Sequence, residues 1–499
     1  MKKNNYYLIT GGLGFIGSKI SEIITQTDKN SVCVLLDNFT VYIDPIKSYY
    51  GDYRKKRFEK IINPKDYKDS KSSRIIVERG NASDPKITIE LINKYKPKII
   101  YHTAGMPLAR LKNAVAKEFR EGSVDSTTNI IESVDYVQKQ SNYKLKRFLY
   151  VSSSMVYGNF KKPRVTEDEM CNPIEIYGTM KLAGEVVTKG MCYQYKIPYT
   201  IIRPSAVYGP TDMNQRVSQY FIEKALANET LKIHGKNEKL DFTFVDDLAR
   251  GCILAANKSK GENQTFNITY GNSRSLLDFA KILSKHFKGL KYKIVSRDKK
   301  RPKRGTLINS KAKKLLGFKP QIGLEKGTKI YLDFFKKNYI KKKIYMKILG
   351  INHDMFITSA ALIDDGRIVS AIPEERISRE KLSRKFPEKA INQILKENKL
   401  DIDKIDILTN SYNPANLMTK YNPIFSNSRR FRSDYLYSVP DNFFKLNKNQ
   451  DLKNSEYLMQ EIKINNKIKK IYFVNHHLSH AANAFFISPF KKSAILTVD

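Results

Sequence analysis

The first two-thirds of the sequence predicts an α/β fold in which helices cover both faces of a doubly wound parallel sheet. Two observations predict it. Short apolar runs alternate with longer helical patterns as far as about residue 335, and a glycine-rich turn follows the first run. We expect strands at 6–10, 32–36, 99–102, 147–152 and 199–203. The lysine-rich, aperiodic stretch 44–73 predicts an insertion on a loop.

Composition narrows the class of protein. The 499 residues predict two to four domains, and the formal charge of +39 is spread along the chain, so we expect no nucleic-acid partner. No apolar run reaches the length of a membrane helix, and the N-terminus has no signal-peptide pattern, which predicts a cytoplasmic protein without a membrane partner. The four scattered cysteines predict reduced core residues.

The segment TGGLGFIGSKI places Gly11, Gly14 and Gly17 at three-residue spacing where a strand gives way to a helix. Glycines allow a tight turn and a close approach of a pyrophosphate, whose charge the helix N-terminus stabilises. Asp37 ends the next apolar run, where its carboxylate can accept hydrogen bonds from a ribose. A 2′-phosphate would be repelled there, so the pattern favours NAD over NADP.

A second pattern follows a serine cluster at 152–154, where Tyr177 and Lys181 share one face of a predicted helix. A free tyrosine has a pKa near 10 and needs a nearby positive charge to act as a base at neutral pH. Lys181 and an oxidised nicotinamide ring can supply that charge. A serine hydroxyl can then hydrogen-bond the reacting oxygen of a substrate hydroxyl while Tyr177 takes its proton.

Residues 1–335 resemble the extended short-chain dehydrogenase/reductase family, close to the NAD-dependent nucleotide-sugar epimerases and dehydratases. The matching segments are TGGLGFIG, LLDN, YHTAG, YVSSSMVYG, YGTMK, IIRPSAVYGP, LDFTFVDDLARG and RPKRG…KKLLGFKP. The resemblance implies a Rossmann-type fold with a small C-terminal substrate subdomain at roughly 204–335, and Ser153 as the catalytic serine. It implies dinucleotide contacts at Gly11, Gly14, Phe15, Ile16, Gly17, Asp37, Asn38, Asn81, Ala104, Tyr177 and Lys181.

Departures from the family pattern bear on the substrate. Ser154 and Met155 stand where 4,6-dehydratases carry an Asp-Glu pair, which disfavours dehydration. Leu240 replaces an arginine that usually holds a substrate phosphate, Ala206 replaces a usual asparagine, and Arg301 matches the remaining phosphate-clamping arginine. The resemblance implies a 4-epimerase of a nucleotide-activated sugar, with Ser154 and Arg301 at the substrate, and leaves a reductase as an alternative. It also implies a homodimer through the helices near residues 125 and 177.

A basic stretch at 336–345 predicts a linker, after which MKILGIN begins a new strand. Asp365-Gly366 predicts the turn of a hairpin. Farther on, His476 and His480 lie four residues apart on a predicted helix, a spacing that suits a divalent metal better than a core or capping histidine.

Residues 346–499 resemble the N-terminal part of the O-carbamoyltransferases that decorate antibiotics and nodulation factors. The resemblance implies part of an actin-like ATPase-superfold domain, a metal such as iron on His476 and His480, and His353 as the base for the acceptor hydroxyl. The matching part stops at TVD, before the family's nucleotide-binding turn, so we expect residues 346–499 alone not to transfer carbamoyl groups. Carbamoyl transfer as the main activity, with the first domain supplying the sugar, remains an alternative, and so does a non-catalytic module that senses a dinucleotide or sugar.

Overall fold

The protein is described by a computed structural model. The residues that it describes are 5–38, 40–41, 74–106, 116–212, 214, 216–298, 301–338, 347–352, 358–364, 367–381, 386–410, 431–432, 459–464 and 467–473. The chain divides into two compact units, residues 1–340 and 341–499. The insertion predicted at 44–73 lies outside the described residues.

The first unit is built on a seven-stranded, all-parallel sheet with the strand order β13-β8-β6-β5-β1-β2-β4. The strands are β1 (Asn5–Thr10), β2 (Ser31–Asp37), β4 (Ile75–Arg79), β5 (Ile99–His102), β6 (Arg147–Val151), β8 (Tyr199–Arg203) and β13 (Gln264–Asn267). Each of the five predicted strands is present, although β6 ends one residue earlier than expected. The strand order reverses between β1 and β5, which is where sheets of this kind bind their ligands.

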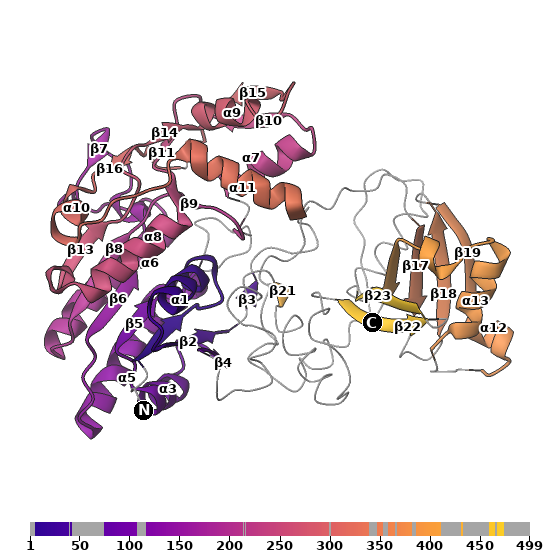
Figure 1. The fold of residues 1–499 in the computed structure, drawn as a ribbon, viewed down its shortest axis with the longest axis horizontal. Helices are drawn as coiled ribbons and strands as arrows, with labels where there is room; N and C mark the ends of the chain where they lie inside the picture. The colour runs from indigo at the N-terminus through magenta and orange to yellow at the C-terminus, as the bar shows by residue number, and fades with distance from the viewer. Residues whose placement is uncertain are drawn as a thin grey trace. The chain divides into compact units, whose positions relative to one another are not determined.

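Helices cover both faces of this sheet (Figure 1). On one face, α1 (Phe15–Thr27) packs against α8 (Val245–Asn257). On the other face, α5 (Ser126–Gln140) packs between α3 (Pro85–Tyr95) and α6 (Ile176–Gln194). The core of the second set contains side chains of the central strands together with those of α3 and α5. Because both faces are covered, the central strands consist almost entirely of buried residues.

Residues 204–338 add several small elements with a core of their own, which includes Phe221, Phe242, Phe279 and Tyr331. They gather in the upper part of Figure 1. The paired strands are β9 (Val207–Tyr208) with β12 (Thr243–Phe244), β10 (Leu231–His234) with β15 (Tyr292–Val295), β11 (Lys239–Leu240) with β14 (Arg274–Ser275), and β16 (Thr306–Leu307) with β7 (Arg164–Val165). The helices are α7 (Val217–Leu226), α9 (Leu276–Ser284), α10 (Ser310–Leu316) and α11 (Leu324–Asn338).

The second unit contains a six-stranded mixed sheet in the order β19-β18-β17-β20-β23-β22. The strands are β17 (Lys347–Asn352), β18 (Ser359–Asp364), β19 (Arg367–Pro373), β20 (Ile407–Asn410), β22 (Met459–Ile464) and β23 (Lys467–Phe473). The helix α13 (Glu388–Glu397) packs Ile391 and Ile394 on Leu349 and Leu362 of the sheet, and α12 (Glu374–Ser378) precedes it. The predicted hairpin corresponds to antiparallel β18 and β19, and its turn lies outside the described residues.

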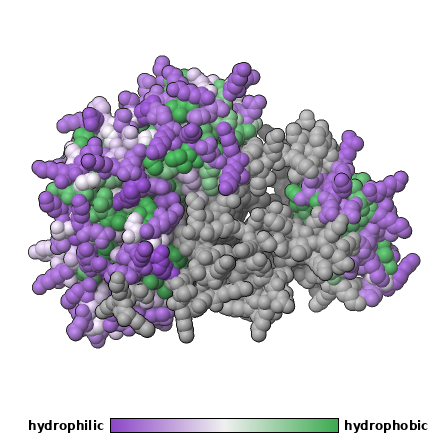
Figure 2. All heavy atoms as spheres, in the orientation of Figure 1, coloured by the Kyte–Doolittle hydropathy of each residue, from purple (hydrophilic) through white to green (hydrophobic). Residues whose placement is uncertain are grey.

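Two further short strands are β3 (Thr40–Val41) and β21 (Phe431–Arg432). Hydrophilic side chains cover most of the described surface that Figure 2 presents, in keeping with the high lysine content. Within the described residues, no helix combines the length and apolar character needed to span a bilayer.

Candidate functional site

The glycine turn between β1 and α1 is packed too tightly for side chains. Gly11 has a φ of +63°, and a Cβ added to it would lie 2.9 Å from the Cα of Ala104. A Cβ on Gly17 would lie 2.5 Å from the Gly11 carbonyl oxygen. Gly14 is the N-cap of α1 and has no side chain to occupy the helix terminus. The turn therefore leaves the amide groups at the start of α1 open to an anionic ligand.

The carboxyl ends of β2 and β4 form the next part of the site. Asp37 ends β2, and its Oδ2 accepts a hydrogen bond from the Leu13 amide of the glycine turn at 3.0 Å. The Gly80 amide donates to the Asp37 carbonyl at 3.0 Å, which brings the exposed residues Asn38 and Asn81 to the same edge. A carboxylate thus lies beside the glycine turn, where an adenosine ribose would be held.

The predicted tyrosine, lysine and serine come together at the ends of β6 and α6. Ser153 caps a 3₁₀ turn, η4 (Ser154–Tyr157), and its hydroxyl lies near enough to the half-buried Tyr177 to lower the pKa of the phenol. One helical turn farther along α6, the buried Lys181 donates from Nζ to the Val151 carbonyl at 3.0 Å. A phenol, a hydroxyl and an ammonium therefore lie at the carboxyl edge of the sheet.

A short loop after β5 joins this group to the glycine turn. Ala104 packs on Gly11, and a Cβ on the next residue, Gly105, would lie 3.2 Å from Lys181 Nζ. A π-helical turn, η3 (Glu121–Asp125), lies between α4 (Ala116–Arg120) and α5, and the Gly122 carbonyl packs against Gly105. The glycine turn thus contacts Ala104, and Lys181 lies next to Gly105, so both belong to one site.

Burial and nearby charges act on the two ionisable groups in opposite directions. Burial raises the pKa of Tyr177, whereas the Ser153 hydrogen bond and the positive charge of Arg216 lower it. Burial lowers the pKa of Lys181 to about 8, and the charge of Glu185 opposes this shift. Lys181 therefore loses its proton at lower pH than an exposed lysine does.

Sequence reasoning missed Arg216. Its guanidinium lies 5.9 Å from the centre of the Phe15 ring at the start of α1, and its Nη1 donates to the buried Asp212 at 3.1 Å. Arg216, which directly precedes α7, therefore lies near the glycine turn and acts on Tyr177 through its charge. No motif surrounds it, and its 39-residue separation from Tyr177 follows no helical or strand period.

Arg301 and Arg304 lie on the segment after β15, which also contains Arg297. Arg301, the predicted phosphate contact, is exposed and lies 3.4 Å from Asp298. Arg304 is half-buried, and burial together with the charge of Arg301 lowers its pKa to about 10, while the charge of Glu175, two residues before Tyr177, opposes this shift. Sequence reasoning missed Arg304, which is more enclosed than Arg301.

The other substrate positions lie in the interior. Ser154 is buried, and its amide donates to the Pro204 carbonyl at 2.8 Å. Leu240, where an arginine is usual, is buried in the core of residues 204–338. Ala206 takes a left-handed backbone conformation, with a φ of +38°.

A buried histidine at the end of β5 was also missed. His102 Nδ1 lies 2.6 Å from Thr10 Oγ1, and its Nε2 lies 3.1 Å from Thr127 Oγ1. Burial lowers its pKa to about 3, so the ring is neutral. Its contact with Thr10, the residue before Gly11, stabilises the strand end at which the glycine turn begins.

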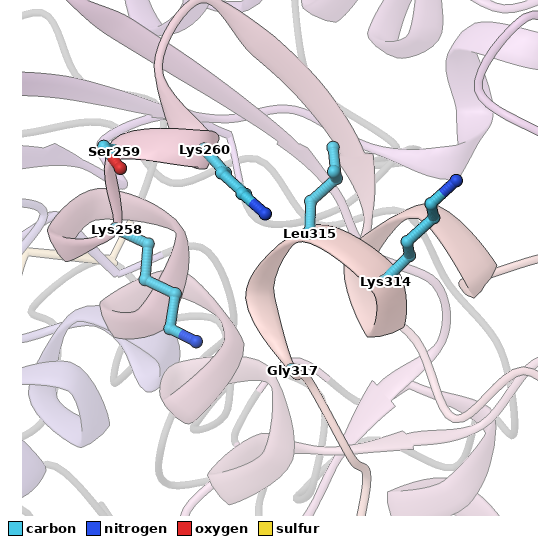
Figure 3. A pocket seen from close by; sticks show the side chains of 6 residues that line it. All are labelled: Lys258, Ser259, Lys260, Lys314, Leu315 and Gly317. Atoms are coloured by element: carbon cyan, nitrogen blue, oxygen red, sulfur yellow. The ribbon is translucent and has the colours of Figure 1, made fainter.

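The predicted residues of the second unit, His353, His476 and His480, lie outside the described residues. Among the side chains that the structure does describe, no group of three or more metal-ligating residues is present. A separate pocket of about 470 Å³ on the first unit is lined by Lys258, Ser259, Lys260, Lys314, Leu315 and Gly317. Figure 3 shows the Lys258 and Lys260 ammonium groups extending into it, and no residue of the tyrosine site lines it.

The chain is similar to several known proteins. The dTDP-D-glucose 4,6-dehydratase of Dictyostelium discoideum is 29% identical over 287 residues, covering 55% of this chain and 60% of its own. UDP-glucuronate 4-epimerase 4 of Arabidopsis thaliana is 26% identical over 355 residues, covering 66% and 75% respectively. The structure of a UDP-glucuronic acid 4-epimerase from Bacillus cereus, in complex with UDP-glucuronic acid and NAD, superposes with a TM-score of 0.58 at 26% identity. The match covers 67% of this chain and 100% of the other.

Both resemblances drawn from the sequence are confirmed. Residues 7–269 match the NAD dependent epimerase/dehydratase family, and residues 347–499 match the carbamoyltransferase N-terminus. The chain therefore belongs to the NAD-dependent epimerase/dehydratase family and carries a carbamoyltransferase N-terminal domain after it.

Proposed function

We propose that the first unit is an NAD-dependent 4-epimerase of a nucleotide-activated sugar. The observation that carries the proposal is the placement of Tyr177, beside Ser153 and one turn from Lys181, at the same sheet edge as the glycine turn. The Bacillus cereus relative, described with UDP-glucuronic acid and NAD, supports the cofactor and the class of substrate.

The cofactor site fits a dinucleotide. Gly11 and Gly17 leave no room for a Cβ, so a pyrophosphate can approach the start of α1, and the carboxylate of Asp37 lies where a ribose hydroxyl would donate to it. When bound, NAD accepts a hydride from the sugar and returns it. Asn38, Asn81 and Ala104 would lie along the same dinucleotide.

Tyr177 acts as the general base. Its phenolate would take the proton of the sugar C4 hydroxyl when C4 is oxidised, and the phenol would return that proton when C4 is reduced on its other face. Ser153 donates a hydrogen bond to the same sugar oxygen. Arg216 supplies the positive charge that lowers the pKa of Tyr177. The Lys181 ammonium, one helical turn away, would add a second positive charge beside the phenolate.

We favour epimerisation over dehydration because a dehydratase needs a further acid and base to remove water. Ser154 and Met155 occupy the two positions after Ser153, and both side chains are buried. Neither provides a carboxylate. A reductase remains the alternative, in which the hydride would not return to the sugar. We propose that Ser154 and Arg301 contact the substrate, as the resemblance implies.

A panel of UDP-, GDP- and dTDP-sugars, analysed by mass spectrometry and NMR, tests the proposal. An epimerase changes no mass, a dehydratase product lacks one water, and a reductase consumes NADH. Bound NAD should copurify with the full chain. Tyr177→Phe should lower turnover by about 10²–10⁴-fold and leave the bound NAD in place. Full turnover by this variant would exclude Tyr177 as the base.

The match of residues 347–499 favours a second candidate, O-carbamoyl transfer to a sugar that the first unit supplies. In this candidate His476 and His480 bind the metal, and His353 is the base. Elemental analysis of the purified chain and of His476→Ala/His480→Ala tests the metal, which should be lost from the variant. Labelling of a sugar from radioactive carbamoyl phosphate would establish the transfer.

A further inference from the structure

The end of β6 contacts α6 at successive residues. The Val151 carbonyl accepts from Lys181 at 3.0 Å, and the next residue, Ser152, donates from its hydroxyl to Glu185 Oε1 at 2.6 Å. The residue after that, Ser153, lies beside the tyrosine at the start of the helix and lowers its pKa. The three helix residues, Tyr177, Lys181 and Glu185, are spaced four apart and therefore lie on one face of α6. Each of them lies against one of the three consecutive residues 151–153.

Glu185 is the least exposed of these three helix residues. Arg203, at the end of β8, donates from Nε to Oε1 at 2.9 Å and from Nη2 to Oε2 at 2.7 Å. The remaining Nη1 donates to the Tyr157 hydroxyl at 3.0 Å and to the Glu167 carbonyl at 3.1 Å. Only 1% of the surface of Glu185 is exposed, so both carboxylate oxygens are paired in the interior.

This arrangement acts on the neighbouring lysine as well as on the fold. Burying an ammonium favours its neutral form, and Glu185 is the charge that opposes this effect at Lys181. The bidentate pair with Arg203 also holds the carboxylate in one place, one helical turn from Lys181. Loss of Glu185 would therefore affect both the charge on Lys181 and the position of α6 against the end of β6.

We propose that Glu185, held by Arg203 and Ser152, is a positioning residue for the redox reaction. It fixes the turn of α6 that carries Tyr177 and Lys181 against the end of β6, and it keeps the Lys181 ammonium charged. This inference rests on the proposed function, in which Lys181 acts as a cation beside the tyrosine.

Three variants test it. Glu185→Gln removes the charge and keeps the size, and Glu185→Asp keeps the charge. Because Glu185→Gln leaves a buried guanidinium without its carboxylate, the double variant Glu185→Gln/Arg203→Gln is made in case the single variant does not fold. Thr188→Ala is the matched control, since Thr188 is buried on the same helix and donates only to the Gly184 carbonyl of its own helix at 2.7 Å.

The first measurement is the pH dependence of kcat. Activity requires a protonated Lys181, so the alkaline limb reports its ionisation. In Glu185→Gln and in the double variant this limb should move to lower pH by about one unit, which is about a tenfold loss of kcat on that limb. Glu185→Asp should restore most of it. Thr188→Ala should lower the melting temperature without moving the limb.

The second measurement does not depend on turnover. An NMR titration of ¹⁵N-labelled lysine, with the Lys181 signal identified by its loss in Lys181→Arg, follows the same ionisation in the resting protein. The signal should titrate at lower pH in the charge-removing variants. If the sugar panel gives no turnover, the proposed function fails and this titration still decides the role of Glu185. Variants that are less stable but keep the parental titration of Lys181 would overturn the proposal.

Discussion

At the scale of single residues, the positive charge that lowers the pKa of Tyr177 belongs to a residue that the sequence did not predict. Lys181 occupies the predicted position, but its ammonium is bonded to a backbone carbonyl, and Arg216 is the positive charge that lowers the pKa of Tyr177. Arg216 lies on a segment that sequence patterns do not connect to the site. The tyrosine is therefore assisted by a residue that lies directly before α7, outside the segments that carry the predicted site residues.

In the complex with NAD, where the oxidised nicotinamide ring would lower the pKa of Tyr177, we predict that Arg216→Leu moves the acid limb of the kcat profile to higher pH, because loss of the positive charge raises that pKa. A shift of one unit would lower kcat on that limb about tenfold. Arg216→Lys should keep most of the parental profile, and Arg164→Leu, which removes an exposed arginine, should leave it unchanged. An acid limb that stays in place in Arg216→Leu would contradict the prediction. The pH dependence of kcat at saturating substrate is the measurement.

His102 makes stability depend on pH. Its pKa is about 3 in the folded protein and about 6.5 in an unfolded chain, so only the unfolded state binds the proton between these values. Stability contributed by the neutral ring is complete above about pH 6.5 and is lost as the pH falls, by at most about 1.4 kcal/mol per unit. His102→Asn should therefore show a flatter decline of the denaturation midpoint between about pH 6.5 and pH 4. Equal slopes in both proteins would exclude His102 as the source.

At the scale of elements, buried strands and their order of appearance follow from the sequence. Apolar runs such as 32–36 are predicted correctly because both faces of the sheet are covered, so the strand is buried along its length. Gly11 follows such a run and Asp37 ends one, whereas their contacts with a dinucleotide stay a prediction. Local patterns do not predict the π-helical turn η3, whose form depends on packing against Gly105 and α6. Arg216 and Arg304 were missed for the same reason, since tertiary contacts alone bring them to the site.

The close approach of α6 to η3 gives a prediction for two glycines of one helix. A Cβ on Gly184 would lie 2.5 Å from the Ser123 carbonyl oxygen and 2.2 Å from the Tyr150 hydroxyl, whereas nothing lies within 4 Å of one on Gly190. Gly184→Ala should destabilise the protein by about 1–3 kcal/mol through overpacking and displace the catalytic turn. Gly190→Ala should stabilise it by about 0.5–1 kcal/mol. Thermal unfolding of both variants measures the difference, and equal effects would contradict the packing argument.

At the scale of the whole molecule, the chain joins two α/β units with different sheets, one all-parallel and one mixed. The coarse fold class was predicted because each unit begins with its own apolar strand pattern. The metal-binding histidines stay a prediction, since they lie outside the described residues. The high positive charge of the chain bears on assembly, because like charges oppose association unless apolar surface is buried.

Such surface is present on α5 and α6, which pack side by side. Tyr136 on α5 is 52% exposed, and Val186 and Tyr193 on α6 are 63% and 86% exposed. We predict a homodimer through these two helices, in which burial of these side chains outweighs the repulsion between the positively charged chains. Val186→Asp/Tyr193→Asp should dissociate it, whereas Ile368→Asp, on the second unit and 57% exposed, should not. Added salt should strengthen the dimer by screening the repulsion. Sedimentation velocity measures both effects, and a dimer that survives the double substitution would place the interface elsewhere.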